Sequence, residues 1–293
     1  MTGVCAHITI STPHPQNEKF RPAPAITSKD FADKIKICIF TLQIINIGMR
    51  KFRFYILAIA AVCAVACADK ESKSDIPEFK TFEYEYIDEG RFNITISYER
   101  IANSADNAAL AIIDSMNYNT TFGEFAFEKQ DLQRSCEIFK DAAVASMQEY
   151  NFGDVECELH LYQVASLVRD NSVICYDTVI ETDFGGVYPL VNHTYECYDV
   201  ASGSAYDFGY LNEGEWYDAL VEVIYNKLDE AYGEQFFINS PAHLYLPEIA
   251  YLTDGGIVFQ YQTYEIGDAE LGSIAVEVTD AELEAVGAPL VWK

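Results

Sequence analysis

Four cysteines are the residues beyond position 67 whose type and spacing suggest covalent chemistry. They are Cys136, Cys157, Cys175 and Cys197. No CxxC pair and no Cys/His spacing typical of zinc is present. Four cysteines allow three complete pairings. If the segments around Cys175 and Cys197 form a hairpin centred on Gly186, these two cysteines lie opposite each other. We therefore predict a disulfide between them, and the alternative is four reduced, buried thiols.

A further cysteine, Cys67, ends a segment typical of protein export. Residues 49–67 read MRKFRFYILAIAAVCAVAC, with a basic start, an apolar middle and small residues before the cysteine. The apolar stretch is short for a bilayer of about 30 Å, which needs about 20 helical residues. The string Ala64-Val65-Ala66-Cys67 resembles the bacterial lipoprotein box. We therefore predict cleavage before Cys67 and lipidation of its thiol, and the alternative is a plain secretory signal with an incidental cysteine.

The position of this signal organises the rest of the chain. An export signal acts at a free amino terminus, so we predict Met49 as the true start of translation. The polar segment that follows Cys67 has the composition of a tether. The predicted divisions are a mis-translated upstream segment (1–48), a lipoprotein signal peptide (49–66), a tether (67–78), a first α+β subdomain (79–185) and a second (186–293).

The charge of the chain is strongly acidic. The 293 residues carry 46 Asp and Glu against 19 Lys and Arg, and without residues 1–66 the balance is 43 to 11, a formal charge of −32. Such a surface repels phosphate backbones, which excludes nucleic acid as a partner. It attracts a cation or a cationic protein, with an attraction that is screened beyond about 10 Å in 0.1 M salt.

No catalytic, cofactor or metal site emerges from the motifs. The exported part has three histidines, His160, His193 and His243, each isolated in a strand-like context. Sequences of the GxSxG, HExxH, P-loop and GxGxxG types are not found in a fitting context. Paired carboxylates of the glycosidase kind remain an alternative, because candidate pairs are everywhere among so many acids. We therefore predict a protein that is not an enzyme and has no cofactor.

Alternating residues predict strands along much of the chain. Phe82, Tyr84 and Tyr86 recur at every second position, and after a turn the segment 92–98 repeats the pattern. Residues 155–182 read as two long strands joined at 169–171, and 188–198 as a third. Three shorter strands follow after residue 244. Tyrosine is abundant in these strands, and a row of Tyr on an exposed sheet face can contact a carbohydrate or a protein.

Three stretches have helical periodicity instead. A helix is expected from Ser104 to Met116, followed by a polar loop at 117–127, a second helix from Leu132 to Tyr150, and a third over 212–231. Thr279 with Glu282 three residues later predicts a capping box for a short final helix. The sum is an α+β fold, mostly antiparallel sheet with three main helices packed on one face, in two closely packed subdomains.

The order of these parts resembles a bacterial envelope family of paired domains. The family occurs in the extracytoplasmic part of the lysozyme-sensing anti-sigma factor RsiV and before the catalytic domain of the peptidoglycan deacetylase PdaC. Residues 252–283 (LTDGGIVFQYQTYEIGDAELGSIAVEVTDAEL) look like its closing hairpin, strand and helix, and 183–189 (DFGGVYP) like its Gly-Gly turn. The family commonly has Gly-Gly-Ala-His where this chain has Gly185-Gly186-Val187-Tyr188, so the role of that histidine does not carry over.

Together these features predict a lipoprotein of the Bacteroidota type, held in the cell envelope by Cys67, with an ectodomain that binds a ligand. The resemblance and the acidic charge favour a cationic protein such as a lysozyme, with a peptidoglycan component second. The alternative is a cell-wall carbohydrate hydrolase that uses paired carboxylates.

Overall fold

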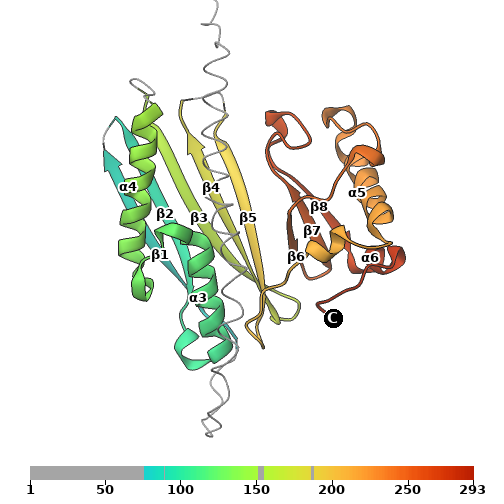
Figure 1. Ribbon diagram of the computed structural model, residues 1–293, viewed down its shortest axis with the longest axis horizontal. Coiled ribbons are helices and arrows are strands. Elements are labelled where there is room, and N and C mark those ends of the chain that lie inside the picture. Colours follow the sequence, from blue (N-terminus) through green and yellow to red (C-terminus); the bar gives the residue numbers. More distant parts are fainter. Residues whose placement is uncertain (1–75, 89, 151–154, 186–187) are drawn as a thin grey trace, which may run out of the picture.

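The computed structural model describes residues 76–88, 90–150, 155–185 and 188–293. They form two sheets and four α-helices, which confirms the predicted α+β fold (Figure 1). The signal peptide, Cys67 and most of the tether lie outside the described residues. Among the described helices, none has both the length and the apolar character that crossing a bilayer requires.

The larger sheet has five strands in the order β1-β2-β3-β4-β5. All neighbours are antiparallel except β2 and β3, which are parallel. A parallel pair needs a long crossover, and here the crossover contains the two helices α3 and α4. The strands are β1 (Phe79–Asp88), β2 (Phe92–Ile101), β3 (Cys157–Val168), β4 (Val173–Asp183) and β5 (Leu190–Asp199).

Helices α3 (Ala108–Phe122) and α4 (Leu132–Tyr150) cover one face of this sheet (Figure 1). The bounds of α4 are those predicted, but α3 begins after Asn107, whose side chain accepts hydrogen bonds from the next turn, and not at Ser104. The predicted loop at 117–127 is also wrong at its start, because residues 117–122 are helical. Asn117 reads as polar, yet its buried amide donates to Tyr98 Oη and Gln163 Oε1.

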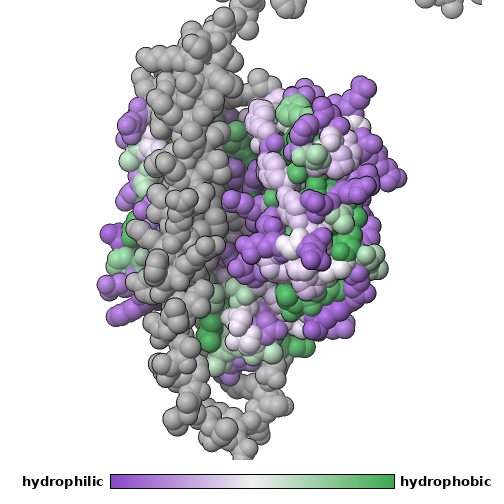
Figure 2. Space-filling model, turned by 45° about the vertical axis from the view of Figure 1, so that its right-hand side comes forward, coloured by the Kyte–Doolittle hydropathy of each residue, from purple (hydrophilic) through white to green (hydrophobic). Residues whose placement is uncertain are grey.

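The smaller sheet contains β6 (Ile249–Leu252), β7 (Gly256–Tyr261) and β8 (Ile274–Thr279), all antiparallel. Its core is shared with α5 (Tyr217–Tyr232) and α6 (Asp280–Val286). The capping box of Thr279 and Glu282 is present. Gly256 is required at the β6–β7 turn, since a Cβ there would lie 2.2 Å from Val278 O. Seen from the side of this sheet and α5, the surface is largely hydrophilic with smaller hydrophobic areas (Figure 2).

The two sheets divide the chain at a different point from the one predicted. A boundary at 185/186 separates β4 from β5, yet these strands pair over their whole length in one sheet. The change from the first sheet to the second therefore comes after Asp199. The hairpin predicted around Gly186 and the predicted boundary at the same place are therefore incompatible, and the pairing of β4 with β5 supports the hairpin.

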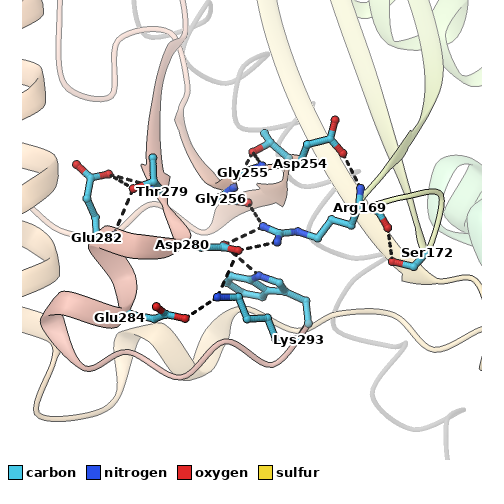
Figure 3. Close-up of polar contacts among 12 residues, drawn as sticks. Arg169, Ser172, Asp254, Gly255, Gly256, Thr279, Asp280, Glu282, Glu284 and Lys293 are labelled. Atoms are coloured by element: carbon cyan, nitrogen blue, oxygen red, sulfur yellow. Dashed lines mark hydrogen bonds and ion pairs between the residues drawn. The ribbon is translucent and has the colours of Figure 1, made fainter.

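Arg169, at the tip of the β3–β4 hairpin, joins the two sheets (Figure 3). Its guanidinium donates to both carboxylate oxygens of Asp280 at 2.8 and 2.9 Å and to Gly256 O at 2.9 Å. It also lies over the ring of Trp292 at 5.3 Å. The side chains of Arg169 and Asp280 are only 11% and 19% exposed. Hydrogen bonds from Arg169 lower the pKa of Asp280.

Replacing this arginine tests the junction. Arg169→Met leaves the partly buried carboxylate of Asp280 without its main partner, so we expect the free energy of unfolding to fall by about 2–3 kcal/mol. Urea unfolding monitored by circular dichroism measures the change. The control is Arg91→Met, which removes an exposed hairpin pair and is expected to cost less than about 1 kcal/mol.

The same pair predicts a pH dependence. Because the pKa of folded Asp280 lies below its unfolded value of about 3.9, the stabilisation is present above that pH and is lost as the pH falls below it. The difference in unfolding free energy between wild type and Arg169→Met should therefore shrink below about pH 4. A difference that stays constant down to pH 2.5, a value chosen well below about 3.9, would contradict the assignment.

Candidate functional site

One face of the five-stranded sheet is turned away from α3 and α4, and we call it the open face. Side chains alternate between the two faces of a strand, so the pairing registers decide which residues lie on it. Two large apolar side chains in the central strand β3 are exposed, Tyr162 at 39% and Val164 at 60%. The residues of the open face include Glu83, Glu85, Thr95, Ser97, Glu99, Glu158, His160, Tyr162, Val164, Asp177, Val179, Glu181, Asp183, Val191, His193 and Tyr195.

The open face is acidic, and no described lysine or arginine compensates its charge. It carries seven carboxylates, and the described lysines and arginines all lie elsewhere on the molecule. The nearest basic residues on these strands, Lys80 and Arg100, alternate onto the helix side, where Arg100 is paired with Asp114. Like charges gathered on one surface produce a negative potential that attracts cations.

His160 is held in place at the centre of this face. Its Nδ1 lies 2.7 Å from Thr95 Oγ1, and its Nε2 lies 3.3 Å from Glu158 Oε2. Its ring stacks on Tyr162, with centroids 5.7 Å apart and an angle of 19°. The exposed ring of Tyr162 is therefore fixed from one side by His160.

A second cluster surrounds Asp177. Tyr195 Oη donates to Asp177 Oδ2 at 3.1 Å, and His193 Nδ1 lies 3.2 Å from Oδ1. His193 stacks on Tyr195, and Tyr195 stacks on Tyr251 of β6 with centroids 3.9 Å apart. Burial, with a contribution from Asp177, raises the pKa of Tyr195. The phenol therefore stays protonated and donates to the carboxylate.

The structure changes the interpretation of the histidines. They were expected to be isolated, but His160 and His193 lie on the same face, each stacked on the tyrosine two residues later. His243 lies elsewhere, near Asn239. The signal in the sequence is the pattern His-x-Tyr at 160–162 and 193–195, within strands whose register puts both on one face.

In the part of the chain that the structure describes, no three His, Cys, Asp or Glu side chains are arranged to hold a metal.

The register of the predicted cysteine pair is confirmed, because Cys175 and Cys197 are direct partners in β4 and β5. The hairpin centre, Gly186, lies outside the described residues. Cys197 O accepts from Tyr206 N, so its peptide groups point away from β4. In such a non-hydrogen-bonded pair the Cα atoms are about 4.5 Å apart, which is within the range of a disulfide.

Both cysteines of this pair are free thiols in the structure, and the bond stays a prediction. Cys175 Sγ donates to Leu252 O at 3.5 Å, and Leu252 N donates to Cys197 Sγ at 3.4 Å. The pair thus lies where β6 meets the larger sheet. Cys136 and Cys157 are buried separately, and burial raises the pKa of Cys136 to about 12, which keeps it protonated and unreactive.

Thiol titration tests the predicted bond. We expect protein purified from the oxidising envelope to gain two hydrogens in mass on reduction, and Cys175→Ser to abolish this gain. Closing a loop of about 20 residues stabilises a fold by about 3 kcal/mol, so the oxidised protein should also unfold at higher urea concentration. Cys136→Ser is the control and should leave the mass change intact. Four reactive thiols in denatured, unreduced protein would contradict the pairing.

Comparison with known proteins shows that this chain has a fold similar to that of solved structures. The chain matches no protein-family model, and no curated protein matches it. It is similar to the crystal structure of a DUF3298 family member from Bacteroides fragilis, with 18% identity and a TM-score of 0.57, over 72% of this chain and 94% of that one. A DUF3298 family protein from Pseudomonas aeruginosa has 12% identity and a TM-score of 0.47, over 71% and 93%. The structural neighbours are thus DUF3298 proteins.

Proposed function

We propose that this chain is a lipid-anchored protein of the bacterial cell envelope that binds a cationic protein on its open face, without catalysing a reaction. A lysozyme is the first partner to test, and a peptidoglycan component is the second. The observation that carries the proposal is a sheet face with seven carboxylates, exposed aromatic and apolar side chains and no lysine or arginine among the described residues.

The chemistry of this face suits lysine and arginine side chains. The carboxylates supply opposite charge, and tyrosine rings supply flat area and cation–π attraction of about 0.5–1 kcal/mol at exposed sites. Tyr162 is fixed by His160, and Tyr195 by Asp177 and Tyr251. Fixed side chains lose little entropy when a ligand binds, so a partner gains more from each contact.

The proposed location rests on Cys67 and the segment that follows it. Several acyl chains on this cysteine would each contribute about 0.8 kcal/mol per buried methylene. The first strand, β1, begins at Phe79, so the proposed tether of residues 67–78 is twelve residues long. A short tether keeps the acidic ectodomain close to the membrane surface.

Binding of hen egg-white lysozyme tests the function. Isothermal titration calorimetry in low salt is expected to show a complex that weakens sharply as NaCl is raised. The triple variant Glu83→Gln, Glu85→Gln and Glu181→Gln removes three charges from the open face, and we expect it to weaken binding by about tenfold or more.

The matched control changes the same number of charges on α5, which lies beyond the smaller sheet and apart from the five-stranded sheet (Figure 1). Glu222→Gln, Asp229→Asn and Glu230→Gln are exposed positions on α5, and they should alter the affinity by less than about twofold. An equal loss in both triple variants would mean that net charge and not the open face attracts lysozyme. Turnover of peptidoglycan that Glu181→Gln abolishes would favour the hydrolase instead.

Membrane fractionation tests the anchor. We expect wild-type protein to partition with membranes and to carry a mass increase on Cys67, whereas Cys67→Ala should be recovered in the soluble fraction or as uncleaved precursor. Cys136→Ser serves as a cysteine control and should fractionate like the wild type. An unprocessed amino terminus in the cytosol would contradict both the anchor and the proposed location.

A further inference from the structure

The two edge strands of the five-stranded sheet, β5 and β1, differ in whether their outward peptide groups have hydrogen-bond partners. At the outer edge of β5, the side-chain amide of Gln262 donates to His193 O at 2.6 Å and accepts from His193 N at 3.1 Å. Tyr206 N donates to Cys197 O at 2.8 Å. Side chains and a short crossing segment therefore occupy this edge and prevent another strand from pairing there.

At the other edge, β1 forms the border of the sheet over ten residues (Figure 1). Glu78 O accepts from Ala102 N and Asp88 O accepts from Arg91 N, so the peptide groups of even-numbered residues point toward β2. Peptide groups alternate along an antiparallel edge strand. No partner among the described residues bonds the outward peptide groups, which belong to Phe79, Thr81, Glu83, Glu85 and Ile87.

The charges on β1 select among the strands that could add to it. Glu83 and Glu85 are exposed and lie on the open face, next to Ser97 and Thr95 of β2. Pairing with a second copy centred on Tyr84 would place Glu83 opposite Glu85, and like charges directly opposite are destabilising. A strand with lysine or arginine at every second position places opposite charges there instead.

We infer that β1 accepts an extended basic segment of the partner protein as a sixth strand of the sheet. This inference rests on the proposed function, because the partner is cationic, and adds the way in which it binds. Main-chain hydrogen bonds to the outward peptide groups of β1 supply affinity, and the carboxylates of Glu83 and Glu85 supply selectivity for basic side chains.

Proline substitution on the full-length protein tests this edge directly. The double variant Thr81→Pro and Ile87→Pro removes two outward N–H donors and keeps every carboxylate and every bond to β2, since proline is tolerated at such edge positions. The matched control is Thr81→Ala with Ile87→Ala. The probe is a fluorescein-labelled peptide, acetyl-TKVKTKVKT-amide, and fluorescence anisotropy measures its binding.

We expect the proline variant to bind the peptide about tenfold more weakly than wild type, and the alanine variant to stay within about twofold. A peptide with glutamate in place of lysine should not bind. Thermal unfolding shows whether the proline variant is folded. As a second measurement, hydrogen exchange on the wild type should show slower exchange of the outward amides of β1 when the lysine peptide is bound.

Three results would overturn the inference. The first is that the proline and alanine variants bind the lysine peptide equally and that the amides of β1 do not exchange more slowly. The second is that the glutamate peptide binds the wild type as tightly as the lysine peptide does. The third is that the wild type sediments as a dimer and the proline variant as a monomer. If lysozyme binds through the open face while β1 is unaffected, the proposed function stands and β1 is not the docking edge. If the peptide adds to β1 but lysozyme does not bind, the docking edge stands and the proposed partner fails.

Discussion

The arrangement of this protein depends on how the second sheet packs against the end of the first. Val173, Cys175 and Cys197 lie in the same hydrophobic core as α5 and the three-stranded sheet, and the amide of Gln262 bonds the peptide group of His193. The smaller sheet therefore covers one end of the face opposite α3 and α4, and no other described element covers the rest. The open face therefore ends where the smaller sheet packs against β4 and β5.

Much of the fold could be predicted from periodicity. The alternation at 82–98 predicted the first hairpin, and the symmetric positions of Cys175 and Cys197 predicted the register of β4 and β5. Both predictions were possible because a strand with one buried face shows its pattern over a few neighbouring residues. The extension of α3 past Asn117 could not be predicted, since its amide is buried against Tyr98 and Gln163 from other strands. Local polarity does not reveal a partner 46 residues away.

The candidate site was harder to predict for the same reason. His160 and His193 each look isolated in the sequence, and only the pairing of β3, β4 and β5 brings them to one face with Asp177. Composition did indicate an acidic surface and many tyrosines in strands. It did not show that the basic residues of β1 and β2 alternate onto the opposite face. A charged face of this kind costs stability through repulsion, and binding a cation would relieve that repulsion.

The parallel pairing of β2 with β3 also bears on how the chain folds. Thr95 pairs with His160 across 65 residues, whereas β3, β4 and β5 form a meander of local hairpins. Loop closure makes distant contacts slow to form. We therefore expect the meander to form early and the β1–β2 hairpin to dock last, an order that pulsed hydrogen exchange during refolding would reveal or refute. The portion of the sheet that is completed latest would then be the portion nearest the amino-terminal end of the described fold.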